Sequence, residues 1–342
     1  MKLVVKDIIK ETEDALSVCF KNGSIFSKIS YNPGQFLTVH VPIDGQIHKR
    51  AYSFSSSPSE EKDLKITIKR VEKGLVSNHI HDQLKIGDKI NVDSPTGSFF
   101  VKPEKEAKKQ YVFFAGGSGI TPIFSILKSV LAREPKSKIL LVYANQNQEA
   151  IIFQKTLEDI AKKHQDAFAV EHILTKNNQP GENYHSGLIS NTLLSKIFKK
   201  HQIVFTNHNY MICGPFGYME KIKELLQYNG VESTNIMVEV FKSPKVVISG
   251  KDLISDVEIK YNGQTHKLKV PGNKSILQTA LNNNIVLPYA CRAGMCVSCK
   301  AQCESGEVKM TDGHFLEQEH LDAGNILTCV SYPVTERVVI VY

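Results

Sequence analysis

Three stretches of the chain differ in the spacing of their hydrophobic residues. In the first, residues 1–103, apolar and polar side chains alternate in short runs such as 35–41 and 64–69. A period of two is typical of strands with one buried face. Turn-forming pairs such as Pro33-Gly34 separate the runs. The alternation therefore predicts several short strands that form a small antiparallel β-barrel.

In the second stretch, residues 104–241, the rhythm changes to strand, helix, strand. Continuous apolar runs at 111–115, 139–143 and 210–212 are typical of buried strands, and 153–164 reads as a helix. Five apolar residues after the first run fall on one helical face, namely Ile123, Ile126, Leu127, Val130 and Leu131. The repeated unit predicts an α/β domain with a doubly wound parallel sheet.

The third stretch begins after a predicted linker at 242–253 and covers residues 254–342. Four of the chain's seven cysteines lie here with the spacing C-x4-C-x2-C, a gap of 29 residues, and C; they are Cys291, Cys296, Cys299 and Cys329. This is the plant-type spacing of a [2Fe–2S] cluster held by four thiolates. Small residues, among them Gly294 with its access to positive φ, let backbone N–H groups approach the sulfurs. A structural zinc site and disulfide-bonded cysteines remain alternatives, although Cys329 has no near partner in sequence.

The string CRAGMCVSC, residues 291–299, also resembles plant-type ferredoxins. The resemblance implies an α+β, ferredoxin-like β-grasp domain for 254–342, with the four cysteines as ligands of the cluster.

A first candidate ligand site follows a predicted strand of the barrel and reads Arg50-Ala51-Tyr52-Ser53. Arginine suits a pyrophosphate, tyrosine offers a flat face for an aromatic ring, and serine can donate to that ring's heteroatoms. Further along, backbone amides and a hydroxyl in a second segment can cradle phosphate oxygens; its residues include Gly74, Val76 and Ser77. Taken alone, a strand with one arginine and several serines is equally well an ordinary strand.

A second candidate site lies between a strand and a helix and reads GGSGITP, residues 116–122. Its glycines let the backbone approach a pyrophosphate, and the following helix N-terminus faces the anion. We expect Thr121 to be the N-cap and Pro122 the first helical residue. Cys213, Gly214 and Pro215 follow a later strand of the same sheet. An ordinary capped turn, and a buried small thiol at Cys213, are the alternatives.

Together, the patterns RxYSxxS, GxVS, GDxxxxxxPxGxF, GGxGxTP and CGP resemble the ferredoxin–NADP reductase superfamily, in its FAD-binding branch. The resemblance implies FAD in the barrel and NADH or NADPH in the α/β domain. It assigns the flavin pyrophosphate to Arg50, the flavin ring to Tyr52 and Ser53, and a position near the nicotinamide to Cys213. The remaining cofactor-binding positions that it implies are Gly74, Val76, Ser77, Gly116, Gly117, Ser118, Gly119, Thr121, Gly214 and Pro215.

The domain order is similar to that of reductase components of multicomponent oxygenases, such as the phenylacetyl-CoA epoxidase type. The similarity implies an oxidoreductase that passes electrons from NAD(P)H through FAD and a [2Fe–2S] cluster to an oxygenase or similar iron protein. A redox-sensing module without turnover is one alternative. Another is an NADH oxidase or disulfide reductase that uses the thiol of Cys303.

Charge and local chemistry refine this picture. The net charge is +7, of which the first 253 residues carry +8 and the remainder −1. The positive charge forms no basic stripe with interleaved aromatics, so we expect no nucleic-acid partner. No apolar run reaches about eighteen residues, and the N-terminus does not resemble a signal peptide, so we expect no membrane insertion and a cytoplasmic location. Gln146 stands where NADPH-using relatives often carry a cation, which favours NADH unless Lys155 or Lys176 reaches the site.

Overall fold

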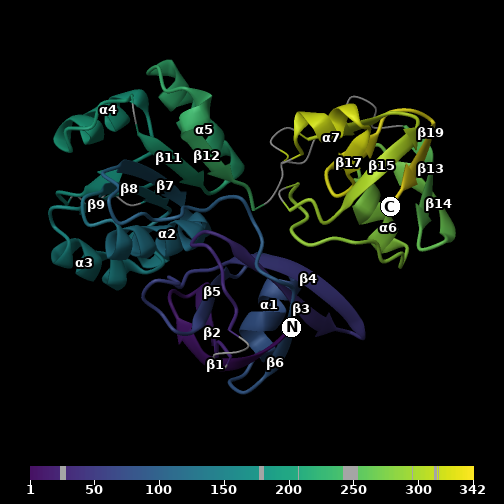
Figure 1. Ribbon diagram of the computed structural model, residues 1–342, viewed down its shortest axis with the longest axis horizontal. Helices are drawn as coiled ribbons and strands as arrows, with labels where there is room; N and C mark the ends of the chain where they lie inside the picture. The colour runs from purple at the N-terminus through teal and green to yellow at the C-terminus, as the bar shows by residue number, and fades with distance from the viewer. Residues whose placement is uncertain are drawn as a thin grey trace. The chain divides into compact units, whose positions relative to one another are not determined.

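The structure is a computed structural model that divides into two compact units, Met1–Glu239 and Val240–Tyr342 (Figure 1). It describes residues 1–23, 28–176, 181–206, 208–241, 253–294, 296–311, 314 and 316–342. Apart from Leu253, the predicted linker at 242–253 lies outside the described residues. No helix among the described residues is long and apolar enough to cross a membrane.

The first part of unit 1 is an antiparallel sheet of six strands in the order β4-β3-β6-β1-β2-β5. The strands are β1 (Lys2–Lys10), β2 (Ala15–Phe20), β3 (Phe36–Ile43), β4 (Gln46–Ser53), β5 (Leu64–Lys69) and β6 (Lys89–Val92), with helix α1 (Leu75–Gln83) between the last two. A bridge between Phe54 and Ile66 joins the two edges of the sheet. The predicted small barrel is therefore confirmed, and β5 coincides with the alternating run 64–69.

The second part of unit 1 is a parallel sheet in the order β10-β9-β8-β7-β11-β12. Its strands are β7 (Gln110–Gly116), β8 (Lys138–Asn145), β9 (Phe168–Leu174), β10 (Tyr184–Ser186), β11 (Asn209–Cys213) and β12 (Ile236–Glu239). Its helices are α2 (Ile120–Arg133), α3 (Gln154–Lys163), α4 (Asn191–Lys200) and α5 (Phe216–Tyr228). Figure 1 shows α2 and α3 on one face of the sheet and α4 and α5 on the other, the predicted doubly wound arrangement.

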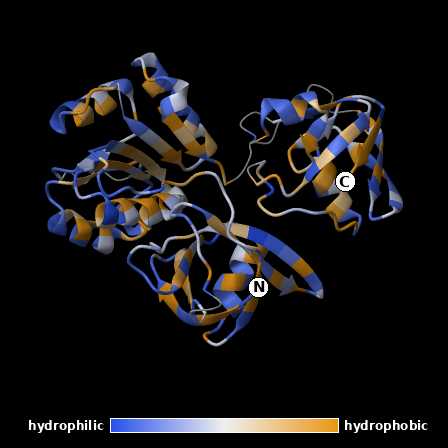
Figure 2. Cartoon of the chain, viewed as in Figure 1, coloured by the Kyte–Doolittle hydropathy of each residue, from blue (hydrophilic) through white to orange (hydrophobic). Residues whose placement is uncertain are grey.

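The strand order places a topological switch point between β7 and β11. From β7 the chain proceeds through β8, β9 and β10 on one side, and it returns to β11 and β12 on the other. Ligands of open α/β sheets bind outside the carboxyl ends of the strands at such a point. Residues 116–119, which follow β7, and 214–215, which follow β11, lie there. Figure 2 shows hydrophobic and hydrophilic bands along the flanking helices. Helices α3, α4 and α5 each keep an exposed face, whereas every residue of α2 from Ile120 to Val130 is buried.

Unit 2 contains a five-stranded mixed sheet in the order β14-β13-β19-β15-β17 and a two-stranded sheet of β16 and β18. The strands are β13 (Ile254–Tyr261), β14 (Gln264–Pro271), β15 (Lys300–Ser305), β16 (Val308–Met310), β17 (Asn325–Leu327), β18 (Ser331–Pro333) and β19 (Arg337–Val341), and the helices are α6 (Ile276–Asn282) and α7 (Gln318–Asp322). The hairpin β13–β14, the helix α6 and the parallel pair β13–β19 give the α+β arrangement expected of a β-grasp domain.

Candidate functional site

Strand β4 presents the first candidate site. Arg50 and Tyr52 lie two residues apart, so they share a face of the strand. Burial raises the pKa of Tyr52 to about 12, and the positive charge of nearby Arg50 opposes that rise. Arg50 donates from Nη1 to the carbonyl of Lys49 at 2.7 Å and belongs to none of the ion pairs among the described residues. A guanidinium beside an aromatic ring and without a carboxylate partner fits the phosphate groups and ring of FAD. Ser53, the last residue of β4, is buried.

The second flavin segment forms the start of helix α1, with Gly74 as its N-cap residue. A Cβ on Gly74 would lie 2.6 Å from the hydroxyl of Ser77, so the turn requires glycine. The Ser77 hydroxyl accepts from the backbone N–H of Val71 at 3.2 Å, and Val76 packs into the barrel core. The predicted phosphate site is thus the N-terminus of α1. The Ser77 hydroxyl is already bonded to the local turn, and the helix dipole would attract the anion.

At the switch point, three of the predicted glycines hold two loops against each other. A Cβ on Gly119 would lie 2.1 Å from the carbonyl oxygen of Cys213. A Cβ on Gly116 would lie 2.7 Å from Pro215, and one on Gly214 would lie 3.0 Å from Gly116. No side chain larger than hydrogen fits between these backbones. The glycines after β7 and β11 therefore bring the two predicted nicotinamide segments together.

Gly117 differs from these three glycines because it adopts φ +51° and nothing lies within 4 Å of an added Cβ. Its carbonyl accepts a hydrogen bond from the hydroxyl of Tyr143 at 3.0 Å. It is therefore the glycine of this loop that leaves space for a ligand beside the backbone, next to the partly exposed Ser118. This open, glycine-lined backbone ahead of α2 fits the pyrophosphate of a dinucleotide.

The predicted cap of helix α2 is wrong. A 3-10 turn over Gly117–Gly119 runs directly into α2, so the helix begins at Ile120 and its N-cap residue is Gly119. Thr121 lies inside the first turn, where its hydroxyl donates to the carbonyl of Ser118 at 3.0 Å, and Pro122 follows it. The prediction failed because the 3-10 turn at Gly117–Gly119 already starts the helical path of the backbone, so the helix needs no cap at Thr121.

Cys213 ends β11 at the switch point, but its side chain is fully buried in the core below α2. Burial raises the pKa of its thiol, so the sulfur is neutral at physiological pH. The predicted position beside the nicotinamide remains a prediction for this residue.

The four spaced cysteines form two pairs. The backbone N–H of Cys291 donates to Sγ of Cys296 at 3.3 Å, and hydrogen bonding to the Cys291 side chain lowers the pKa of Cys296 to about 5. In the other pair, the hydrogen bond between Cys299 and Cys329 lowers the pKa of Cys299 and raises that of Cys329, because the two sulfurs share a proton. Two sulfur pairs are the donor set that two neighbouring iron ions require.

The backbone around these sulfurs has the predicted donors. Gly294 has φ +78°, and the N–H of Ala293 donates to Sγ of Cys291 at 3.4 Å. Arg292 and Val297 also have positive φ, at 58° and 47°, which neither residue type would lead one to expect. A β-branched residue in this region is strained, and such strain is tolerated where the backbone must be held for a ligand.

The zinc alternative fits this arrangement less well. A structural zinc site usually combines two short Cys or His pairs in the sequence, whereas Cys329 has no near partner along the chain. All seven cysteines are free thiols, which does not support the disulfide alternative.

Cys303 is the thiol that a disulfide reductase would use. It donates to the carbonyl of Ser305 at 3.5 Å, and burial raises its pKa, so it is a poor nucleophile.

One further set of polar residues in unit 1 has a role that the motifs of the sequence do not reveal. Ser56, the last residue of the RxYSxxS pattern, and Ser57, which follows it, are fully buried and bond to helix α2. Small polar residues carry no periodic hydrophobic signal, so only the structure reveals that they join the barrel to the α/β part.

Three family models match the chain in series. An oxidoreductase FAD-binding domain matches residues 2–101, an oxidoreductase NAD-binding domain matches 113–224, and a 2Fe-2S iron-sulfur cluster binding domain matches 259–334. A relative from Mycolicibacterium smegmatis, the ferredoxin reductase component of 3-ketosteroid-9-alpha-monooxygenase, is 33% identical over 100% of this chain and 97% of its own length. The chain belongs to the family of oxygenase reductase components.

Other members of the oxygenase reductase family match over nearly the full length. One component of the 1,2-phenylacetyl-CoA epoxidase of Escherichia coli K12 is 29% identical over 99% of this chain and 96% of its own. The solved structure of phthalate dioxygenase reductase has the same fold, with a TM-score of 0.68 and 23% identity over 100% of this chain and 98% of that one. The chain is thus an oxidoreductase with FAD, NAD and [2Fe–2S] domains, which supports electron delivery over the sensor and thiol-reductase alternatives.

Proposed function

We propose that this chain is an NADH-dependent reductase that works in the cytoplasm and supplies electrons to an oxygenase of its own system. In this proposal, residues 1–103 bind FAD, 104–241 bind the nicotinamide cofactor and 254–342 hold the [2Fe–2S] cluster. When bound, FAD exchanges two electrons with a nicotinamide, and the cluster exchanges one at a time with an iron protein.

The residues of β4 and α1 bind and orient the flavin. Arg50 would pair with the pyrophosphate, Tyr52 would offer its aromatic face to the flavin ring, and Ser53 would offer its hydroxyl as a donor. The first turn of α1 would face a phosphate with the N–H groups of Leu75, Val76 and Ser77, while the N–H of Gly74 donates to the carbonyl of Val71 at 2.8 Å and closes the turn. The position of Arg50 beside Tyr52 supports this assignment, since a single ligand spans both side chains.

The loops after β7 and β11 bind the nicotinamide cofactor. Gly116, Gly119 and Gly214 keep the loops in contact, and Gly117 and Ser118 lie against the pyrophosphate. Thr121 fixes the first turn of α2 through its bond to Ser118. Exposed Gln146, at the carboxyl end of β8, supports NADH over NADPH because a neutral amide gives a 2′-phosphate no counter-charge.

Cys291, Cys296, Cys299 and Cys329 would hold the cluster through their four sulfurs. The N–H groups that donate to their sulfurs stabilise the negative charge of the thiolates. The three cysteines outside the cluster, Cys19, Cys213 and Cys303, form no disulfide, which supports a reducing compartment and hence the cytoplasm.

The observation that carries the proposal is the full-length match to oxygenase reductase components, with all three cofactor-binding parts in one order. Its test is anaerobic mixing of the purified, NADH-reduced protein with candidate oxygenase components. We expect one of them to reoxidise the cluster within its turnover time, and to convert its substrate once O2 is admitted. Reduction of the protein by NADH without transfer to any iron protein would contradict the assigned partner class.

A further inference from the structure

Helix α2 is attached to the barrel by three polar side chains on one helical face. They are Ser125, Lys128 and Ser129, at positions i, i+3 and i+4, and their partners are Ser56, Ser57 and Glu61 of the segment after β4. We call these six residues the α2 interface. Every residue of α2 from Ile120 to Val130 is buried, because the helix lies between its own sheet and the barrel.

The hydrogen bonds of the α2 interface are short and directional. The Ser125 hydroxyl donates to the carbonyl of Ser56 at 2.6 Å, and the hydroxyls of Ser57 and Ser129 lie 2.8 Å apart. The Ser129 hydroxyl also bonds to the carbonyl of Ser125 at 2.8 Å. These four serines are fully buried. Buried hydrogen bonds fix a relative position more strictly than apolar contacts, because misalignment leaves the polar groups unsatisfied.

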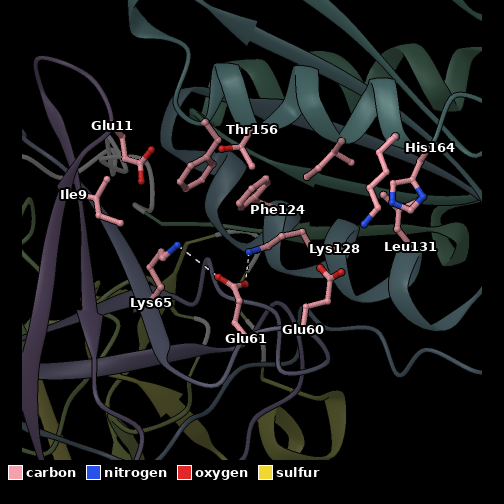
Figure 3. A pocket seen from close by; sticks show the side chains of 13 residues that line it. Ile9, Glu11, Glu60, Glu61, Lys65, Phe124, Lys128, Leu131, Thr156 and His164 are labelled. Carbon is pink, nitrogen blue, oxygen red and sulfur yellow. Dashed lines mark hydrogen bonds and ion pairs between the residues drawn. The ribbon is translucent and has the colours of Figure 1, made fainter.

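Lys128 adds an ion pair to the same interface. Its ammonium group pairs with Glu61, which also lies 3.5 Å from Lys65 of β5, and Figure 3 shows both contacts. Lys128 is 8% exposed and its Nζ lies 4.4 Å from the ring centre of Phe124. An ammonium group held this far from water gives the pair a defined geometry, and removal of one member is more costly than at an exposed site.

The α2 interface lies between the two candidate cofactor segments. Its barrel side begins three residues after Ser53, the end of the flavin strand β4. Its other side is the body of α2, whose N-terminus is the loop with Gly117. A helix is a stiff element with a fixed rise of about 1.5 Å per residue, so a displacement at Lys128 is transmitted to that loop.

We propose that the α2 interface positions the nicotinamide loop relative to the flavin strand, and that Lys128 is its main positioning residue. The inference rests on the proposed function, and it assigns a role in the reaction to residues that touch neither cofactor. A misplacement of about 1 Å between reacting groups can lower a rate about a hundredfold. Loss of the ion pair therefore slows flavin reduction while NADH binding, which depends on the α/β part, persists.

The test uses Lys128→Met and Lys128→Arg in the full-length holoprotein. Methionine keeps the aliphatic length without the charge, and Glu61 keeps Lys65 as a partner. Arginine restores the charge, and a cavity of about 460 Å³ lined by Lys128, Phe124 and Leu131 gives it room (Figure 3). Lys6→Met is the control for loss of a lysine ion pair away from the α2 interface, because the exposed pair of Lys6 with Asp63 lies wholly within the barrel.

Two measurements are made on each variant. Stopped-flow absorbance gives the limiting rate of flavin reduction and the Kd for NADH, and amide hydrogen exchange reports residues 55–61 and 120–133. For Lys128→Met we expect a limiting rate lower by about tenfold, a Kd changed by less than about twofold, and faster exchange in both segments. We expect near wild-type values for Lys128→Arg and Lys6→Met.

A limiting rate in Lys128→Met within about twofold of wild type, at full flavin content, would overturn the inference. An equal loss in Lys6→Met would do the same, since it would show that the effect is not specific to the α2 interface. If Lys128→Met does not fold, Ser129→Ala removes one contact of the interface and is judged by the same values. If NADH fails to reduce the wild type, the proposed function itself fails, which distinguishes the two outcomes.

Discussion

At the scale of single residues, Arg50 combines a fixed position with an unbalanced charge. It donates to the carbonyl of Lys49 and lies close enough to Tyr52 to affect its pKa, yet no carboxylate pairs with it among the described residues. Lys49, the next cation along β4, lies 3.4 Å from Asp93 and is balanced within the barrel. We therefore expect substitution of Arg50 to weaken cofactor binding and substitution of Lys49 to leave it unchanged.

Arg50→Ala should weaken FAD binding by about 2–3 kcal/mol, the range of a lost hydrogen bond to a charged group. The Kd from flavin fluorescence titration of the apoprotein measures this directly, and the purified variant should lose flavin on dilution. Lys49→Ala should bind FAD as the wild type does. Equal affinity in the Arg50 variant and the wild type would remove Arg50 from the pyrophosphate site.

Selectivity between NADH and NADPH depends on the carboxyl ends of β8 and β9. The backbone N–H of Lys176 donates to the carbonyl of Gln146 at 2.8 Å, and both residues are exposed. The neutral amide and a cation therefore lie side by side at the predicted ribose site. Lys155, the other cation that the sequence offers, lies in α3.

We predict a higher kcat/KM for NADH than for NADPH in the wild type. Gln146→Arg should move the ratio toward NADPH by roughly tenfold, about 1.4 kcal/mol, because a guanidinium binds the 2′-phosphate. The effect should shrink at high salt. Steady-state kinetics with both cofactors measures the ratio. A strong wild-type preference for NADPH that Lys176→Gln abolishes would instead assign the 2′-phosphate to Lys176.

At the scale of elements, one buried carboxylate joins three parts of the α/β sheet's edge. Glu171 of β9 is fully buried, and it bonds to His185 of β10 at 2.6 Å and to His201, which ends α4, at 2.6 Å. Lys200 of α4 lies 2.8 Å from the same carboxylate. Burial alone would raise the pKa of Glu171, but the hydrogen bonds from these three partners outweigh it and lower the pKa to about 2.

The lowered pKa makes the stability of this edge dependent on pH. A carboxyl group with a depressed pKa stabilises the fold above its unfolded value of about 4.3, and the contribution is lost as pH falls toward 2. Glu171→Gln should therefore lower the stability of the α/β part by about 3 kcal/mol at pH 7 and by about half of that near pH 3, where a carboxyl group with a pKa of about 2 is still mostly ionised. Thermal melting by circular dichroism at both pH values measures the difference. A deficit of equal size at both would contradict the assigned ion pair.

Elements with strong periodicity are predictable from the sequence, and those without it are not. The alternating run 64–69 predicts β5 to the residue, whereas the segment of α1 has no hydrophobic stripe and suggests only a phosphate loop. The GGSGITP motif places the start of α2 too late, because a 3-10 turn of glycines continues into the helix. Local sequence patterns predict local structure. They do not predict the conformation of the loop after β7, because that conformation depends on contact with the loop after β11.

The candidate site divides in the same way. Cysteine spacing predicts the sulfur ligands because ligand geometry is encoded locally, and the glycine motif predicts the loop at the switch point. The sequence does not show that Gly116, Gly119 and Gly214 serve loop-to-loop packing, since that contact joins segments about a hundred residues apart. The α2 interface escapes sequence analysis for the same reason.

At the scale of the whole molecule, the chain combines a two-electron and a one-electron carrier in one polypeptide. Unit 1 contains the FAD and NAD family domains, and unit 2 contains the 2Fe-2S domain. Covalent linkage holds the two at a high effective concentration, so unit 2 needs no strong charge to find unit 1. Loss of the cluster should therefore leave the upstream reaction of unit 1 intact.

The central claim is that electrons from NADH reach a cluster held by Cys291, Cys296, Cys299 and Cys329. The most direct test is the low-temperature EPR spectrum of protein reduced anaerobically with NADH. We expect the [2Fe–2S] signal in the wild type and in Cys303→Ser. We expect no such signal in Cys296→Ser, because serine is a poor ligand for this soft site, while its FAD and NADH–ferricyanide activity persist. A native-like signal in Cys296→Ser, or none in the NADH-reduced wild type, would contradict the account.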